Sequence, residues 1–256
     1  MKKLFLVALI ATLSISCFAQ KIEDVTSPRG ITEQIIQHKG FTVSYNDNLL
    51  IPNWVTWELT ADEANAKVAS RTDEFFPDPD VKGYTALTTD YSNSGYARGH
   101  MAPAADMKWS RVAMEESFYL SNICPQLPSI NDGPWLELEQ KCRYWAKKYG
   151  SIYITCGPLF LSATEKNIGK NQVAVPDAFF KVILQKRDNT WTAAGFVVLN
   201  IPYGANVSIN ELACSVRAIE MKTGYQFFTG LPKDIAEQVK TQFNINDWYI
   251  PNWTKN

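Results

Sequence analysis

Residues 96–107 read YARGHMAPAADM, and this stretch restricts both the fold and the chemistry of the chain more than any other. It contains His100, one of two histidines in 256 residues, two positions after Arg98. In an extended strand, residues two positions apart point to the same side. A strand here would place an imidazole, which titrates near pH 6.5 in model peptides, beside a guanidinium that binds anions. The pattern favours phosphate chemistry.

Downstream, Pro134 to Tyr149 predict an amphipathic helix, with Asp132 as the expected N-cap and Gly150 as the expected end. Apolar residues recur at three- and four-residue spacing, which predicts a stripe packed on a sheet: Trp135, Leu138, Cys142, Trp145 and Tyr149. Glu139 and Arg143 fall on the border of this stripe. We therefore expect both side chains to face a seam between core and solvent.

The rest of the chain mixes strands and helices without regular alternation. The expected strands are Phe41–Tyr45, Trp54–Leu59, Phe118–Ile123, Ser151–Thr155, Ala178–Lys186 and Trp191–Leu199. The expected helices are a capped turn from Thr60 through Ala69, Arg111–Ser117, Ser208–Lys222 and Lys233–Phe243. This order predicts the α+β class.

Composition predicts one folded domain over residues 20–256. The chain is 46% hydrophobic and 20% charged, and no linker, repeat or low-complexity segment divides it. Without Lys2 and Lys3 it has 23 basic and 26 acidic side chains, a formal charge of −3. This balance excludes a basic coat protein for nucleic acid, so any site for a polyanion must be local.

Residues 1–19 are typical of a signal peptide, because Lys2 and Lys3 precede an apolar run that ends in small residues. Cleavage is expected after Ala19, and lipid attachment at Cys17 is the weaker alternative. No later window approaches the roughly 20 apolar residues of a membrane span. We therefore expect a secreted or periplasmic protein without a transmembrane segment.

Four cysteines lie beyond this segment: Cys124, Cys142, Cys156 and Cys214. An oxidising compartment would allow up to two disulfides among them, with three connectivities. Buried free thiols are an equally good interpretation, and both stay open. The absence of a CxxC spacing disfavours a zinc site.

Several side chains are candidates for metal-assisted phosphodiester hydrolysis. His100 can act as a general base, although a lone histidine is more often structural. Asn131 offers a neutral oxygen that Mg²⁺ accepts, and its alternative role is an ordinary turn or cap. Glu139 can orient metal-bound waters or form a surface pair with Arg143. Asn122 is either a supporting amide or a satisfied buried one.

Three arginines, Arg71, Arg98 and Arg143, can each bind phosphate oxygens through two parallel donors. Singly, each is more often just solvated. The other histidine, His38, lies in a polar segment and is not expected to have a function. No glycine pattern that cradles phosphates is present, so a nucleotide cofactor is not indicated.

Taken together, YARGHMAPAADM, YLSNICPQ at 119–126, and then Asn131, Trp135, Leu138 and Glu139 make the chain similar to the DNA/RNA non-specific endonucleases, the family of endonuclease G. The ordered blocks run from about Arg71 to Glu139. The resemblance implies a ββα-metal (His-Me finger) fold with a central, mainly antiparallel sheet flanked by helices.

The resemblance also implies roles for individual residues. His100 matches the general base, Asn131 the direct Mg²⁺ ligand, and Glu139 the residue that holds the waters of the metal. Arg71, Arg98 and Arg143 match the phosphate-contacting arginines, and Asn122 the supporting amide. One departure is visible: this chain has Ala97 where the family usually has Asp, which puts fine tuning in doubt but removes neither base nor ligand.

The leading hypothesis is a secreted, Mg²⁺-dependent endonuclease that cleaves DNA and RNA with little sequence preference, with Mn²⁺ as a substitute metal. Two alternatives stay open: a catalytically silent module that binds nucleic acid or protein, and a phosphodiesterase for small nucleotides. The sequence leaves open whether the chain forms a homodimer, whether it prefers DNA or RNA, and its physiological role.

Overall fold

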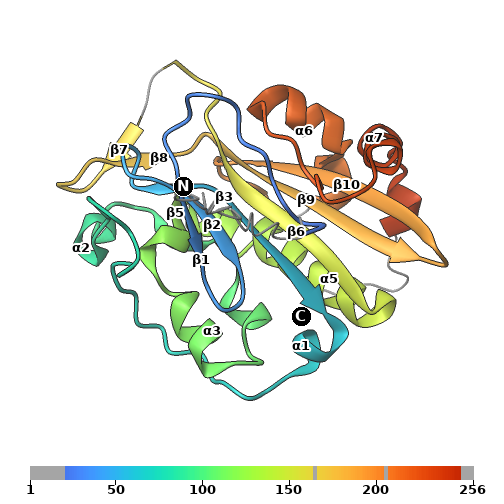
Figure 1. Ribbon diagram of the computed structural model, residues 1–256. Coiled ribbons are helices and arrows are strands. Elements are labelled where there is room, and N and C mark those ends of the chain that lie inside the picture. The colour runs from blue at the N-terminus through green and yellow to red at the C-terminus, as the bar shows by residue number, and fades with distance from the viewer. Residues whose placement is uncertain (1–20, 164–165, 205–206, 249–256) are drawn as a thin grey trace, which may run out of the picture.

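The computed structural model describes residues 21–163, 166–204 and 207–248, and a large antiparallel sheet crosses it (Figure 1). The strand order is β1-β2-β3-β6-β9-β10-β11, and every neighbouring pair is antiparallel. These strands are β1 (Gln34–Gln37), β2 (Thr42–Asn46), β3 (Ile51–Thr60), β6 (Ser151–Leu159), β9 (Ala178–Arg187), β10 (Thr190–Leu199) and β11 (Ala213–Cys214). The predicted α+β class with a central antiparallel sheet is confirmed.

Helices pack on both faces of the sheet. The core on one face includes side chains of α5 (Pro134–Tyr149), and the core on the other face includes those of α6 (Val216–Thr223) and α7 (Lys233–Thr241). Strand β9 serves both cores with alternate side chains, because Phe179 faces α5 while Phe180 faces α6 and α7. The two helices α6 and α7 lie together beside β9 and β10 in Figure 1.

Shorter elements complete the described chain. Strand β4 (Ala97–His100) pairs with β5 (Ile123–Gln126), and β7 (Lys166–Ile168) pairs with β8 (Val173–Val175). The short α-helices are α1 (Ala61–Asn65), α2 (Thr88–Tyr91), α3 (Arg111–Glu116) and α4 (Pro128–Asn131). The 3₁₀ turns are η1 (Ala104–Asp106), η2 (Leu120–Asn122), η3 (Ile209–Leu212) and η4 (Ile245–Trp248).

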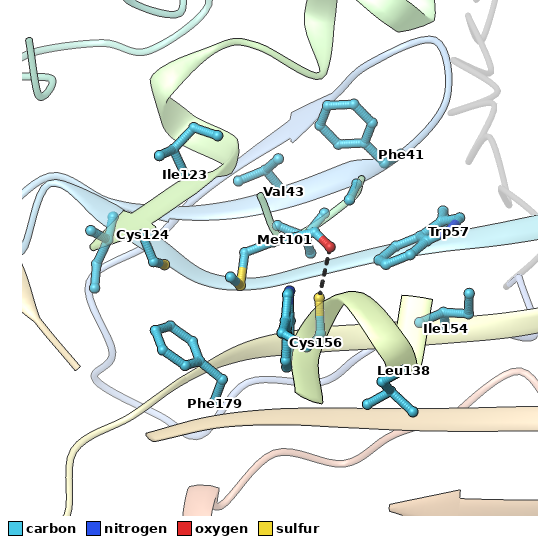
Figure 2. Packing of buried hydrophobic residues seen from close by; sticks show 14 of the residues in the cluster. Phe41, Val43, Trp57, Met101, Ile123, Cys124, Leu138, Ile154, Cys156 and Phe179 are labelled. Atoms are coloured by element: carbon cyan, nitrogen blue, oxygen red, sulfur yellow. Dashed lines mark hydrogen bonds between the residues drawn. The ribbon is translucent and has the colours of Figure 1, made fainter. Parts of the chain in front are cut away.

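The core under α5 joins the main sheet to the β4–β5 pair (Figure 2). Met101, directly after β4, packs with Ile154 and Phe179 of the main sheet in this core. The Cys156 thiol donates to the Met101 carbonyl oxygen at 3.3 Å. All four cysteines of the described chain are free thiols, and three of them are buried. The alternative of disulfides therefore does not hold in this structure.

The strands predicted at 54–59 and 151–155 are longer in the structure, where β3 begins at Ile51 and β6 ends at Leu159. Three other predicted elements differ in kind or are interrupted. Thr60 caps α1 as expected, but the helix ends at Asn65 because the backbone N–H groups of Val68 and Ala69 donate to the Lys108 carbonyl. The expected strand 118–123 is mostly the turn η2, and strand pairing begins only at Ile123. The expected helix 208–222 is divided, because residues 213–214 pair with β10 before α6 begins.

Within the three described ranges, no helix combines the length and apolarity needed to cross a bilayer. The segment 1–19 that we interpreted as a signal peptide, including Cys17, lies outside the described residues.

Candidate active site

The site is built on two strands and a helix, β4, β5 and α5. They occur in this order along the chain, with η1, α3 and η2 between the strands and α4 before α5. His100 is the last residue of β4 and lies opposite Ile123 of β5. The indole N–H of Trp135, on the first turn of α5, donates to the His100 carbonyl oxygen at 3.1 Å. This bond fixes the helix against the strand and sets the distance between His100 and the side chains of α5.

Two glycines permit the close approaches that this arrangement needs. A Cβ at Gly99 would lie 2.2 Å from the Gln126 side chain, and a Cβ at Gly133 would lie 2.1 Å from the Ser129 carbonyl oxygen. Gly133 is also the N-cap of α5, without a side-chain hydrogen bond, so the prediction that Asp132 caps this helix is wrong. Asn131 is the last residue of the separate helix α4.

A cleft of about 270 Å³ lies beside β4 and α5. It is lined by Arg71, Arg98, His100, Asn131, Glu139 and Arg143, together with Pro103, Ala104, Ala105, Asp132 and Leu136. The first six are the base, the amide, the carboxylate and the arginines predicted from the sequence. Residues up to 72 positions apart along the chain therefore share one cleft.

His100 is 7% exposed and sits in an aromatic cage. Its ring meets Phe118 edge-on with centroids 5.0 Å apart, and Phe75 is 5.4 Å away. Nε2 has no hydrogen-bond partner among the described residues. Burial, with the nearby Arg71 charge, lowers the pKa of His100 to about 3. The imidazole is therefore neutral at pH 7 and can accept a proton.

Burial of this neutral imidazole predicts a measurable dependence of stability on pH. An unfolded histidine titrates near pH 6.5, whereas the folded pKa of His100 is about 3. Below pH 6.5 the unfolded chain binds a proton that the folded chain does not, so stability is lost as pH falls. Between pH 7 and pH 4 we expect wild type to lose a few kcal/mol more than His100→Gln, at about 1.4 kcal/mol per pKa unit. Urea unfolding at each pH measures this difference, and parallel curves for the two proteins would contradict it.

Asn131 and Glu139 supply the oxygen atoms that suit a hard cation. The Asn131 Nδ2 donates to Asp132 Oδ1 at 2.9 Å, which leaves the amide oxygen as the atom available to a metal. Glu139 is 9% exposed, and burial raises its pKa to about 7, opposed by the charges of Arg143 and Lys181. Since a cation in the cleft would favour the ionised carboxylate, the two side chains fit Mg²⁺ and its water shell.

Arg143 is held by a carboxylate that the sequence analysis missed. Its Nη1 donates to Oδ1 of the fully buried Asp106 at 2.9 Å, and Trp57 Nε1 donates to Oδ2 at 3.3 Å. Burial opposes the charge of Arg143, but Asp106 and Glu139 outweigh it and raise the pKa of the guanidinium. The alternative of a Glu139–Arg143 surface pair is therefore replaced by an Arg143–Asp106 pair. The sequence did contain a signal for it, since Asp106 is the one acidic residue in the mostly apolar run 99–107.

Neutralising Asp106 is expected to cost stability as well as activity. Asp106→Asn keeps the shape but leaves the Arg143 charge without its buried partner, which typically costs about 3–5 kcal/mol. Asp73→Asn is the matched control, because Asp73 pairs with the half-exposed Arg71, a type of pair worth about 0–1 kcal/mol. Urea unfolding and DNA cleavage measure both effects. Equal losses of stability in the two variants would contradict the assignment.

The other two arginines flank the aromatic cage of His100. The Arg98 guanidinium lies 4.6 Å from the Phe75 ring centroid, and that of Arg71 lies 5.2 Å from the Phe118 centroid. Stacking on a ring fixes the plane of a guanidinium while its edge stays available for hydrogen bonds. Both are therefore positioned to bind an anion that enters the cleft.

Asn122 does not line the cleft. It is fully buried, accepts from the Ala102 N–H at 2.9 Å, and donates to the carbonyls of Ala102 and Ser117 at 2.9 Å each. It thus fixes the chain two residues beyond His100, which is a supporting position and not a catalytic one. His38 lies elsewhere and contacts the buried Asp78 at 3.1 Å.

The sequence and the structure were compared with known proteins. Residues 19–234 match the family model described as DNA/RNA non-specific endonuclease. The chain is 36% identical over 220 residues to "Nuclease EXOG, mitochondrial" of Danio rerio, covering 80% of this chain and 64% of the relative. It is 33% identical over 205 residues to human "Endonuclease G, mitochondrial", covering 76% and 69%. The chain thus spans just under two thirds of the zebrafish relative.

A solved structure has the same fold. The crystal structure of an EndoG/EndoGI complex aligns with a TM-score of 0.75 at 29% identity, over 78% of this chain and 88% of that chain. The fold expected from the resemblance is therefore confirmed.

The relatives contradict the predicted localisation. The zebrafish, human, Schizosaccharomyces pombe and Saccharomyces cerevisiae proteins are all named mitochondrial, so the prediction of a secreted or periplasmic protein is wrong. The prediction relied on two lysines, a short apolar run and the small residues that end it, all within residues 1–19.

The prediction of a nuclease is confirmed at the level of the family, because these relatives are named nucleases and endonucleases. The family match covers most of the chain and includes every residue that lines the cleft. This chain belongs to the DNA/RNA non-specific endonuclease family.

Proposed function

We propose that this protein is a Mg²⁺-dependent endonuclease that hydrolyses phosphodiester bonds of DNA and RNA with little sequence preference. The observation that carries the proposal is that His100, Asn131 and Glu139 line one cleft. The products carry 5′-phosphate and 3′-hydroxyl ends, as the family resemblance implies. Mn²⁺ can substitute for Mg²⁺, since both accept oxygen ligands.

His100 acts as the general base. Its neutral ring, which lines the cleft, accepts a proton from the attacking water. The water oxygen then bonds to phosphorus and the bond to the 3′-oxygen breaks. A positioned base of this kind contributes about 10²- to 10⁴-fold to the rate.

Asn131 and Glu139 would hold the cation, Asn131 through its amide oxygen and Glu139 through the waters of the metal. A bound Mg²⁺ supplies Lewis acidity to the phosphate and acidic waters that can protonate the leaving oxygen. The Glu139 carboxylate, once ionised, accepts hydrogen bonds from such waters and fixes their orientation.

Arg71, Arg98 and Arg143 bind the phosphate oxygens and stabilise the charge that develops on them. Contacts to phosphate and sugar carry no sequence information, which accounts for low sequence preference. The affinity for nucleic acid should accordingly fall steeply with rising salt.

Digestion of a supercoiled plasmid and of a long RNA, with Mg²⁺, with Mn²⁺ and with a chelator, tests the proposal. Cleavage of both polymers that stops with the chelator is the expected result. A folded protein that cuts neither polymer with either metal would overturn it. Binding without cutting would select the silent binding module, and hydrolysis of a dinucleotide alone would select the small-nucleotide phosphodiesterase.

A further inference from the structure

A lysine lies buried beneath the cleft in a position that the strand pattern reserves for apolar side chains. Lys181 is 1% exposed in the middle of β9. It lies on the same face of the strand as Phe179 and Ile183, both of which belong to the core under α5. Burying an ammonium group in such a core is costly unless other groups compensate it, so its presence calls for an explanation.

The compensation comes from two tryptophans that reach the active site. The Lys181 Nζ lies 4.2 Å from the ring centroid of Trp135 and 5.2 Å from that of Trp57. Trp135 donates its indole N–H to the His100 carbonyl oxygen, and Trp57 donates to Asp106. The Lys181 ammonium group therefore lies over the rings of both indoles. The edge of the Trp135 ring holds His100, and the edge of the Trp57 ring holds Asp106, the partner of Arg143.

Charge balance supports the same connection. Asp106, Glu139 and Arg143 lie near Lys181 beneath the cleft. The four side chains comprise two acidic and two basic groups. Burial alone would lower the pKa of Lys181, but neighbouring thiol and carboxylate groups, among them Cys156 and Glu139, raise it. Lys181 is thus the second basic group of this cluster, beside Arg143.

We propose that Lys181 is a positioning residue for the hydrolysis: through the faces of Trp135 and Trp57 it fixes His100 and Arg143 in the cleft. This inference rests on the proposed function. Without the ammonium group both indoles lose the cation that lies over their rings. The chemical step should suffer more than the binding of DNA, because Lys181 itself does not line the cleft.

The test compares Lys181→Met with Lys240→Met. Lys240 is the matched control, because it is also a buried lysine, 3% exposed, but it pairs with Glu220 at 2.9 Å on the α6–α7 side of the sheet. We expect Lys181→Met to lower kcat about 10- to 100-fold, the range seen when a group that orients the reacting side chains is removed. KM for DNA should stay near the wild-type value, and Lys181→Arg should recover part of kcat. The near-ultraviolet circular dichroism of the tryptophans should change in Lys181→Met and not in Lys240→Met.

The outcomes separate this inference from the proposed function. If wild type cleaves DNA and Lys181→Met keeps its kcat, or if Lys240→Met lowers kcat equally, the role of Lys181 is overturned and the nuclease assignment stands. An inactive wild-type protein overturns both. If Lys181→Met does not fold, Trp135→Phe tests the same contacts, since it removes the N–H that holds His100, and an unchanged kcat there would equally refute the inference.

Discussion

Replacing His100 with alanine lowers the turnover of plasmid DNA by about 10²- to 10⁴-fold, the contribution of a positioned general base, while DNA binding is retained. The expectation follows from a neutral imidazole that lines the same cleft as Asn131 and Glu139. Binding survives because Arg71, Arg98 and Arg143 still line the cleft. Single-turnover cleavage with Mg²⁺ and fluorescence anisotropy with labelled DNA measure the two quantities.

The control for this experiment is the other histidine. The side chain of His38 is also buried, but it contacts Asp78 and does not line the cleft, so a folded His38→Asn variant should keep its turnover. Imidazole added to His100→Ala gives a second check, because the deleted ring leaves space at the edge of the cleft. Recovery of cleavage by imidazole fits a base, whereas a loss of activity that tracks the loss of folding in both variants would show that His100 is only structural.

Local periodicity predicted the long elements of this fold well. The stripe from Trp135 to Trp145 gave the helix Pro134–Tyr149 with the bounds that the structure shows, and the β9–β10 hairpin was predicted to within one residue at each end. Each of these elements buries a face, so apolar residues recur along it at a regular spacing that the sequence shows. Strand β1 was not predicted, because Gln34–Gln37 is short and mostly uncovered, and its pairing with β2 is what makes it a strand.

The cleft was predicted through residue types and spacing, and the structure brings those residues together. The sequence did not predict the buried charged residues that contact these side chains from below the cleft. Asp106 and Lys181 each look like an isolated charge in an apolar run, and a buried charge acquires its role from its partners. Those partners, Arg143, Trp57 and Trp135, come from elements far apart in the chain, so only the packed structure identifies them.

Two neighbouring side chains in the cleft, Asn131 and Asp132, both offer oxygen atoms to a metal. Asp132 lines the same cleft, is exposed, and carries the charge that Asn131 lacks. Charge alone would favour Asp132 as the ligand of a divalent cation. The hydrogen bond from the Asn131 amide nitrogen to Asp132 favours the opposite assignment, because it engages the carboxylate and leaves the amide oxygen available.

Asn131→Ala should therefore weaken metal-dependent cleavage far more than Asp132→Ala. Loss of a direct ligand is expected to raise the Mg²⁺ concentration for half-maximal cleavage about 10-fold or more and to lower kcat about 10²-fold, or roughly 2.7 kcal/mol of transition-state stabilisation. Asp132→Ala removes only the acceptor that orients the amide, so its effect should be several-fold smaller. Cleavage rates at increasing Mg²⁺ concentrations give both parameters, and calorimetric titration with Mn²⁺ measures binding without turnover. A larger loss of Mn²⁺ affinity in Asp132→Ala than in Asn131→Ala would move the metal ligand to the carboxylate and leave the general-base role of His100 unaffected.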